Sequence, residues 1–585
     1  MKRDDISRDA LQPTPSKGAA LKILGGILAL VGAALAVFGV LKPVFEPDRT
    51  EFTVLQESPE EVLAMVRGFL RNQEPRLQLE GRTIDLSPEV RVVYLDASFE
   101  EPLWVSRDGV TEKARDLVDV VEELEDHALR MSRSRTELLK EALSAAADTT
   151  ASSAERRNAE LLATETFLDA ARDLSDGHLN PGRVLEEWGP AVDEEAGEEH
   201  AIRLLAGLTP SEVLESLTPD LPWYGPTLEA LVRYRSLART GGWPTIDLHP
   251  DSVLEGGDSA LAVRSLRGRF LSGASKEEHR LAERGEGMLY FDENLAEAVR
   301  RFQERHGLEV DGVVGEETLG QLNIPVERRI ADLELSLERM RWLPSLGQRA
   351  IFVNVAGFEL HVLEDSEPVL SMDVVVGRPT WPTAMFTDTM EHVILNPYWH
   401  VPESIEEEEI LPQVRKDPSY LTENDMVIVP ANDNFGKPVP LAEVELGSGE
   451  RYDFRQEPGP ENDLGRMKFL FPNAHNIYLH DTPADHLFEE SRRTFSHGCI
   501  RVADPEGLAR YLFAEAAEPA PSELPGFLAD TERTRVDITE PIPVHVYYLT
   551  AWATEEGTVH FHPDIYGLND PFESEGGTTT HDKGQ

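Results

Sequence analysis

The spacing of apolar residues changes once along the chain, near residue 350, and this change constrains the fold more than any other feature. Before it, apolar residues recur with helical spacing; after it, Val, Ile and Phe gather in short runs broken by turn residues, as in "IFVNVAGFELHVLE" and "LSMDVVVG". At 585 residues the chain is too long for one hydrophobic core. We therefore expect a multidomain α+β protein, with helical domains followed by a mostly β domain.

Helix-start signals divide the first part of the chain. Ser58 with Glu61, and Thr209 with Glu212, have the spacing of capping boxes, in which each side chain bonds the backbone of the other residue. Long amphipathic stretches such as "ARDLVDVVEELEDHAL" lie between them. These patterns predict a helical scaffold domain over residues 50–255.

Residues 256–325 form a compact unit that contains "FQERHGLEVDGVVGEET". The run resembles the small three-helix peptidoglycan-binding domain found in many wall enzymes. A generic helical bundle is the alternative, and a domain of this type can act as a binding module or only as a spacer. The expected helix core positions are Leu261, Leu266, Leu295, Val299, Phe302 and Leu319.

The strand-rich region predicts a β domain over residues 345–567, interrupted by an insertion over 405–475. The insertion opens with the acidic "SIEEEEILPQV" and carries "DNFGKPVP" and "EPGPEND". Charged, Gly/Pro-rich segments suit a mobile cap better than a core, so we expect the insertion to cover a site in the β domain. The polar residues 571–585 predict a disordered tail.

The N-terminal part contains 19 apolar residues without a charge at 23–41, "ILGGILALVGAALAVFGVL". This length suits a membrane-spanning helix, and the Lys and Arg residues that precede it place residues 1–22 in the cytoplasm. The sequence therefore predicts a single-pass protein of the inner membrane. A cleaved signal peptide is the alternative, because "ALA" occurs at 34–36.

Charge and cysteine content exclude several classes of protein. Asp and Glu number 107 against 56 Lys and Arg, a net charge of -51, so binding to nucleic acid through phosphate contacts is not expected. The acid-rich composition resembles that of proteins from salt-loving organisms, although a merely acidic protein is the alternative. With a single cysteine, the chain has no internal disulfide and no Cys-based zinc site.

That cysteine, Cys499, lies in "SHGCIRV", 19 residues after His480 in "NIYLHDTP". A thiol becomes a nucleophile when a nearby base or cation lowers its pKa, and His480, His497 and Arg501 are candidates for this role. Gly498 permits a sharp turn before the cysteine, so the backbone N–H groups around it can face a developing oxyanion.

The combined pattern of His480, Ser496, His497, Gly498, Cys499 and Arg501 resembles the active-site signature of the L,D-transpeptidases. The segments "NPYWHVPESI" and "TAWATEEGTVHFHPDIYG", with the insertion, resemble the large branch of that family in Gram-negative-type bacteria. Proteins of that branch have a membrane anchor, a helical scaffold, a peptidoglycan-binding domain and a catalytic domain with a capping insertion.

The resemblance implies a role for each matching residue. Cys499 would be the nucleophile and His480 the general base, while Gly498 and Cys499 would supply oxyanion-hole amides. His497 would have a supporting role only. Asp481 stands where many relatives have Gly, so only its carbonyl is expected to matter. The implied substrate-binding residues are Arg501, which would anchor a carboxylate or orient the loop, Ser496, and Tyr478, Trp399 and Asn396 along the donor groove.

The implied reaction joins two peptidoglycan stem peptides in a 3→3 cross-link. The thiolate displaces the terminal D-Ala of a donor stem, and an amine of the acceptor stem then resolves the thioester. No cofactor or metal is expected: His560 and His562 would share one face at the solvent edge of a strand, without further ligands. The resemblance also implies other wall synthases as partners and a catalytic part in the periplasm.

Two other functions fit the same residues. In a thiol peptidase or L,D-carboxypeptidase, water instead of an amine would resolve the thioester. In a non-catalytic wall-binding protein, residues 256–325 would be the functional part, although the Cys499 and His480 pair argues against this.

Overall fold

The computed structural model describes residues 59–570, apart from short gaps at 72–74, 80, 97–100, 107–108, 125–127, 130–132, 180–202, 205–206, 250–251, 345, 432, 434–435, 445–451 and 515–519. The described residues all belong to one compact unit. The predicted cytoplasmic tail (1–22), membrane anchor (23–41), Ser58 cap and C-terminal tail (571–585) lie outside the described residues.

The predicted single-pass membrane topology needs correction. Among the helices of the described residues, none is long and apolar enough to cross a bilayer.

The N-terminal domain is built around one long helix, α6 (Ser153–Asp176), whose residues are buried along most of its length. Two small hairpins, β1–β2 and β3–β4, accompany the helices, so the scaffold is not purely helical. The capping box predicted at Thr209 and Glu212 is confirmed at the start of α9. The other elements are α2 (Pro59–Leu70), β1 (Arg76–Leu79), β2 (Arg82–Asp85), α3 (Glu89–Arg91), η1 (Val92–Asp96), β3 (Val105–Ser106), β4 (Gly109–Val110), α4 (Glu112–Glu123), α5 (Arg133–Ala147) and α9 (Pro210–Glu215).

One helix of the predicted scaffold range packs elsewhere. Helix α10 (Tyr224–Arg239) lies against α15 (Val326–Arg341) and shares its apolar core with the β domain. Thr227 of this helix accepts a hydrogen bond from the backbone of Ala553, 2.9 Å away. Helices that precede and follow residues 256–325 in the sequence therefore both contribute to the core of the β domain.

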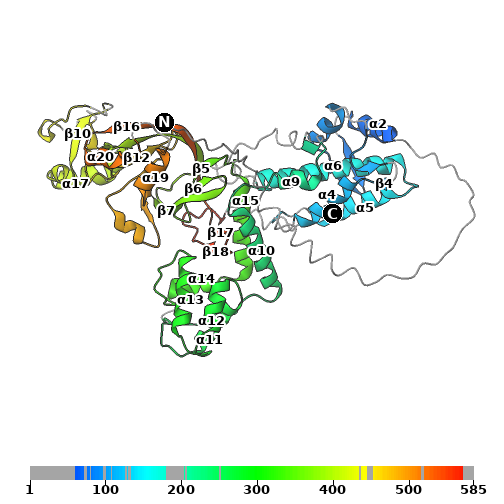
Figure 1. The fold of residues 1–585 in the computed structure, drawn as a ribbon, viewed down its shortest axis with the longest axis horizontal. Helices are drawn as coiled ribbons and strands as arrows, with labels where there is room; N and C mark the ends of the chain where they lie inside the picture. The colour runs from blue at the N-terminus through cyan, green and yellow to red at the C-terminus, as the bar shows by residue number, and fades with distance from the viewer. Residues whose placement is uncertain are drawn as a thin grey trace, which may run out of the picture. The chain divides into compact units, whose positions relative to one another are not determined.

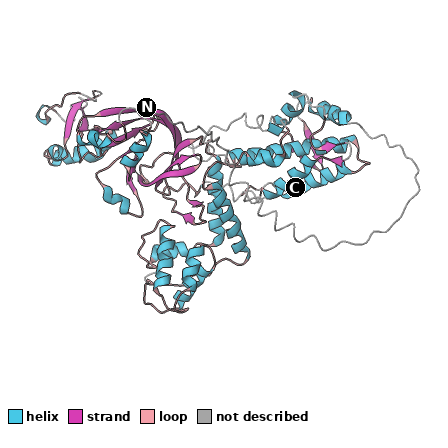
Figure 2. Ribbon diagram, viewed as in Figure 1, coloured by secondary structure: helices cyan, strands magenta, loops and turns pink. Residues whose placement is uncertain are grey.

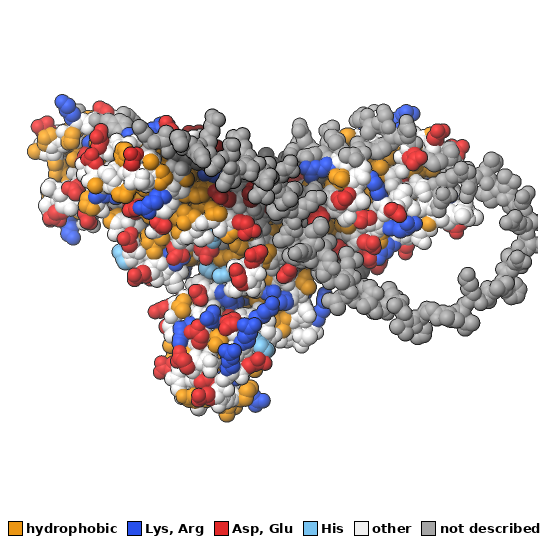
Figure 3. Space-filling view, in the orientation of Figure 1, with side chains coloured by type: hydrophobic (Ala, Val, Ile, Leu, Met, Phe, Trp, Pro, Cys, Tyr) orange, Lys and Arg blue, Asp and Glu red, His pale blue; other side chains and the backbone are white. Residues whose placement is uncertain are grey.

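The small helical domain has a core of its own around Phe270, Phe291 and Phe302. Arg305 and Glu278 form a buried ion pair inside it, and Arg305 also donates to the carbonyl of Val559 in the β domain. Figure 3 shows red carboxylate side chains spread over the visible face and blue Lys and Arg side chains gathered over this domain. Its helices are α11 (Leu261–Leu271), α12 (Lys276–Glu283), α13 (Glu293–Glu304) and α14 (Glu316–Leu322).

The β domain is a nine-stranded sheet in the order β14-β7-β15-β13-β12-β8-β16-β5-β6, and pairing of β6 with β7 closes it on itself. Figure 1 labels β5, β6, β7, β12 and β16 of this sheet, and Figure 2 draws the strands as magenta arrows. The strands are β5 (Arg349–Asn354), β6 (Glu359–Glu364), β7 (Glu367–Gly377), β8 (Phe386–Leu395), β12 (Met467–Leu470), β13 (Leu479–His480), β14 (Thr494–Ser496), β15 (Ile500–Val502) and β16 (Thr534–Tyr547). The other elements of the β domain are α19 (Pro505–Leu512), α20 (Leu524–Ala529), η4 (Asp485–Glu489) and a separate hairpin of β17 (Ala551–Ala553) and β18 (Val559–Phe561).

The insertion forms a subdomain with a separate apolar core that includes Ile405, Ile410 and Phe454. Its three-stranded sheet has the order β10-β11-β9. The subdomain ends earlier than predicted, because β12, inside the predicted range 405–475, pairs with β8 and β13 of the large sheet. The elements are β9 (Trp399–His400), α16 (Glu403–Ile405), η2 (Glu406–Ile410), α17 (Leu411–Lys416), α18 (Tyr420–Glu423), β10 (Met426–Pro430), η3 (Leu441–Glu443) and β11 (Tyr452–Gln456).

His560 and His562 do not lie at a solvent edge, which corrects their expected placement. His560 stacks on Trp552, with ring centroids 4.9 Å apart, and His562 lies 3.2 Å from the carbonyl of Ala356 and against Gly307. Burial lowers the pKa of both imidazoles to about 4. They pack the junction between the β domain and the small helical domain.

Candidate active site

Three neighbouring strands bring the titratable residues of the site into one row. His480 on β13 pairs with Arg501 on the parallel strand β15, and with Lys468 on the antiparallel strand β12. Directly paired residues of adjacent strands point to the same face of a sheet. Tyr478 and Cys499 precede these strands by one residue, two positions before His480 and Arg501, and therefore extend the row on that face.

The loop that carries the cysteine is held by hydrogen bonds of its own. The hydroxyl of the buried Ser496 donates to the carbonyl of Cys499 (2.5 Å) and accepts from the N–H of Gly498 (3.1 Å). The carbonyl of Gly498 accepts from the hydroxyl of Thr383 at 2.9 Å. Gly498 has φ +108°, which other residues rarely adopt, so this turn requires glycine.

This arrangement changes the expected pair of oxyanion donors. The Gly498 N–H is bonded inside the loop, and an oxyanion role for it requires that bond to break. Ser496 accordingly positions the loop instead of facing the open site. Among the described residues, the Cys499 N–H has no backbone partner, so it is the amide available to an anion.

His480 is held in one orientation by the backbone. Its Nδ1 lies 2.5 Å from the carbonyl of Asp481, as expected from the sequence, which leaves Nε2 for proton transfer. The side chain is buried, and burial together with the cation of Arg501 lowers its pKa to about 3. The imidazole is therefore neutral and able to accept a proton throughout the neutral range.

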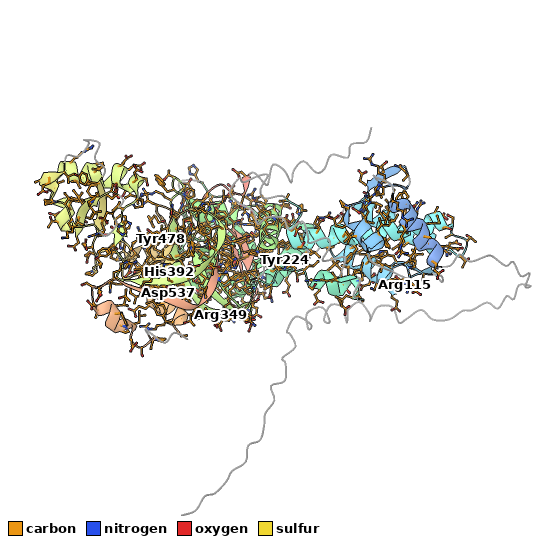
Figure 4. All side chains as sticks on the ribbon, turned by 90° about the horizontal axis from the view of Figure 1, so that it is seen from above. Arg115, Tyr224, Arg349, His392, Tyr478 and Asp537 are labelled. Atoms are coloured by element: carbon orange, nitrogen blue, oxygen red, sulfur yellow. The ribbon has the colours of Figure 1, made fainter. Side chains whose placement is uncertain are left out.

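The Cys499 thiol lies next to Tyr478, whose position is labelled in Figure 4. Its sulfur is 3.9 Å from the carbonyl oxygen of Asn476, and among the described residues no hydrogen bond joins it to His480. Burial raises the pKa of the thiol above its ordinary value, while Tyr478, Lys468 and Arg501 act in the opposite direction. The resting pair is consequently a neutral thiol and a neutral imidazole.

His497 is turned toward the insertion and away from this row. Its Nε2 lies 2.8 Å from Glu409, and Arg378 contacts both side chains. The ring of Trp381 is nearby, with its centroid 6.0 Å from that of His497. His497 thus contacts the insertion, and its supporting role stays a prediction.

Comparisons with known proteins match three parts of the chain. Residues 348–538 match the family model described as the L,D-transpeptidase catalytic domain. The chain carries an L,D-transpeptidase catalytic domain. Residues 88–231 match a "Scaffold domain", and residues 280–322 match a "Putative peptidoglycan binding domain".

A curated protein of Haemophilus influenzae (strain Rd), named "Putative L,D-transpeptidase", is 34% identical over 240 residues. The match covers 40% of this chain and 48% of that protein, so the chain spans about half the length of the relative it matches. Two solved structures are more distant. The L,D-transpeptidase from Mycobacterium smegmatis is 14% identical, with 34% of this chain and 58% of that chain covered and a TM-score of 0.16. The L,D-transpeptidase (Yku) from Stackebrandtia nassauensis is 13% identical, with 54% and 99% covered and a TM-score of 0.20.

The two other residues predicted to line the donor groove, Trp399 and Asn396, lie at the edge of the insertion. Trp399 is half-buried, pairs with Gln456 across β9 and β11, and packs against the core of the subdomain. Asn396 is buried, and its amide bonds the carbonyls of Phe527 and Glu532 and the guanidinium of Arg466. Asn396 therefore holds the end of β8 in place, and a groove-lining role for either residue stays a prediction.

Asp481 has a second contact that ties the insertion to the catalytic strand. Its carboxylate accepts hydrogen bonds from the N–H groups of Arg466 and Thr482, at 2.6 and 2.7 Å. Gly465 has φ +59°, and a Cβ there would lie 2.3 Å from the Asp481 carboxylate. The end of the insertion is thus fixed directly beside His480.

Lys468 is the residue of the site that the sequence did not reveal. Its ammonium lies 3.6 Å above the ring of Tyr478. Burial lowers its pKa to about 8, while the nearby Cys499 acts to raise it. The signal was available in "MKFLF": the apolar Met467, Phe469 and Phe471 alternate as in a strand, but the stretch was assigned to the insertion.

Proposed function

We propose that this protein is a peptidoglycan L,D-transpeptidase that forms 3→3 cross-links through a thioester on Cys499. The observation that carries the proposal is the match of residues 348–538 to the L,D-transpeptidase catalytic domain, with the protein's single cysteine beside a neutral, backbone-held histidine. Stem peptides would be both donor and acceptor, and the matched peptidoglycan-binding domain supports this choice of substrate.

In the first step, His480 Nε2 accepts the proton of the Cys499 thiol after rotation of the cysteine side chain toward it. The thiolate attacks the carbonyl of the third residue of the donor stem, and the Cys499 N–H donates to the oxyanion. The C–N bond then breaks, the leaving D-Ala takes the proton from His480, and the thioester remains.

In the second step, the side-chain amine of the diamino acid on another stem attacks the thioester. His480 accepts the amine proton, the new amide forms, and the thiol is regenerated. Because the imidazole is neutral at neutral pH, it is ready to accept a proton in both steps.

The roles of the two histidines are tested by acylation of Cys499 with a carbapenem, followed by intact-protein mass. We expect Cys499→Ala to take up no label and His480→Ala to lose on the order of 10²-fold in rate, as for a general base. His497→Ala should retain acylation, because this side chain is bonded to Glu409. A dead His497→Ala beside a near-normal His480→Ala would reverse the assignment.

The reaction itself is tested on bare sacculi with product mass analysis. Dimeric muropeptides with 3→3 links are the expected product. Stems that are only shortened would indicate an L,D-carboxypeptidase, and unchanged sacculi together with an unlabelled thiol would indicate a binding protein.

A further inference from the structure

Two cations that form no ion pair among the described residues flank His480. Lys468 and Arg501 are its direct neighbours on β12 and β15. Among the described residues, neither side chain makes a hydrogen bond or an ion pair, and the buried Nε of Arg501 has no acceptor. Both side chains are half-buried, and charges shielded from water are normally paired, so two cations without an ion pair in one row are unusual.

The two cations differ in what lies near them. Arg501 interacts electrostatically with the carboxylate of Asp463, a residue of the insertion. Lys468 interacts with the Tyr478 ring, the Cys499 sulfur and the further cation Arg533. Among the described residues, the Lys468 ammonium is therefore the cation next to the thiol that lacks a nearby carboxylate.

We propose that Lys468, with Arg501 on the other side of His480, forms a carboxylate-binding site beside Cys499. Its ligand is the terminal carboxylate of the residue that leaves the donor stem. This assignment rests on the proposed function and extends it to a residue for which no role was predicted.

The choice of ligand follows from the position of the site. A scissile carbonyl must lie against Cys499 Sγ, and Lys468 is close enough to interact with that sulfur. The terminal carboxylate is attached to the same α-carbon as the leaving nitrogen, so it is the anion closest to the reacting carbon. An ammonium beside the leaving group also favours stems with a free carboxyl end.

The proposal can be tested without transpeptidation, because Cys499 is the protein's only cysteine. Iodoacetate and iodoacetamide alkylate the same thiolate, so the ratio of their rate constants cancels any change in the thiol pKa. The overall charge of -51 disfavours iodoacetate, and only a local cationic site opposes this. We expect Lys468→Gln to lower the iodoacetate-to-iodoacetamide ratio by about tenfold, as for loss of one charge-assisted hydrogen bond.

Two variants control the measurement. Lys468→Arg keeps the charge and should retain most of the ratio. Lys416→Gln removes an exposed lysine of the insertion and should leave the ratio unchanged. An equal ratio in wild type, Lys468→Gln and Lys416→Gln would overturn the proposal.

The wild-type protein gives a second test that does not depend on folding of the variants. N-acetyl-D-alanine carries an amide and a free carboxylate in the spacing of the proposed leaving group. It should protect Cys499 from iodoacetamide, and N-acetyl-D-alaninamide should not. Equal protection by both, or by neither, would count against a carboxylate site.

The outcomes separate this site from the proposed function. If the iodoacetate-to-iodoacetamide ratio depends on the charge of Lys468 but the protein makes no cross-links, the carboxylate site is supported and the proposed transpeptidase function is contradicted. Cross-linking with equal rates on stems ending in a carboxylate or an amide would do the reverse.

Discussion

Two buried arginines of the small helical domain form ion pairs, whereas two half-buried cations of the catalytic sheet form none among the described residues. In the helical domain, Arg305 pairs with Glu278 at 2.5 Å, with the two side chains 4% and 1% exposed. Arg267 pairs with Asp292 at 2.7 Å in the same way. In the catalytic sheet, Lys468 and Arg501 have no ion pair within the part of the chain that the structure describes.

The difference separates charges that maintain the fold from charges kept for a ligand. Burial alone would lower the pKa of Arg305, but Glu278 more than offsets this and raises it. No carboxylate does the same for Lys468, whose pKa falls to about 8. An incoming carboxylate would supply the missing partner, which is what a substrate site requires and a structural pair does not.

The largest expected effect comes from breaking a structural pair. Glu278→Ala leaves the Arg305 guanidinium buried without its partner and should cost about 3–5 kcal/mol in the free energy of unfolding. Lys468→Met removes an unpaired cation and should change the free energy by about 1 kcal/mol or less, in either direction. Urea unfolding monitored by circular dichroism measures both. Similar losses in the two variants would show that the comparison is wrong.

The pH dependence of Cys499 reactivity tests the part of this comparison that concerns the catalytic sheet. Because burial raises the thiol pKa above its ordinary value, the thiolate is the minor form at neutral pH. The rate of alkylation by iodoacetamide should rise about tenfold per pH unit between pH 6 and 8. The His480 pKa of about 3 implies no acid limb near pH 6, because the imidazole does not titrate there.

The same pH profile of alkylation, measured on two variants, separates the effect of Lys468 on the Cys499 thiol from that of His497. Lys468→Met should move the midpoint upward, because it removes a cation that favours the thiolate. His497→Ala should leave the midpoint in place. A wild-type rate that is already constant from pH 6 to 7 would instead mean a resting thiolate–imidazolium pair.

Removing the insertion tests whether its carboxylates affect the cations of the candidate site. Asp463 and Glu409, which face Arg501 and Arg378, both belong to it. The N–H of Asn396 lies 2.8 Å from the carbonyl of Arg466, so a two-glycine link can replace residues 399–463. We expect a folded domain, because the core of the insertion is separate, and cross-linking reduced by about tenfold through loss of the cap.

Carbapenem acylation of the same deletion variant is the control. It should fall less than cross-linking, because a small probe does not need the cap. Unchanged cross-linking after a clean deletion would remove the capping role.

The smallest expected effect is that of salt. At 1 M KCl the Debye length is about 3 Å, so repulsion among exposed carboxylates of this highly acidic chain is screened. The melting temperature should rise by a few degrees from low to molar KCl. The loss of stability in the Glu278→Ala variant should persist at molar KCl, because the ion pair of Arg305 with Glu278 is buried. A flat or falling melting temperature would contradict this expectation.

The sequence alone determined the domain types, the motif and the orientation of one side chain of the candidate site. The "SHGCIRV" signature, the shift from helical to strand-like spacing and the Thr209 capping box are local patterns, and local patterns survive without tertiary structure. The contact of His480 Nδ1 with the next carbonyl was also expected, because it joins neighbouring residues.

Only the tertiary structure decided which distant residues meet. Lys468 reaches the site because β12 and β13 pair in one register, and a shift by one residue would turn it to the other face. Packing likewise placed α10 in the core of the β domain and His562 against the small helical domain. Strand register and domain packing depend on contacts between residues far apart in sequence, and no local pattern of this chain encodes them.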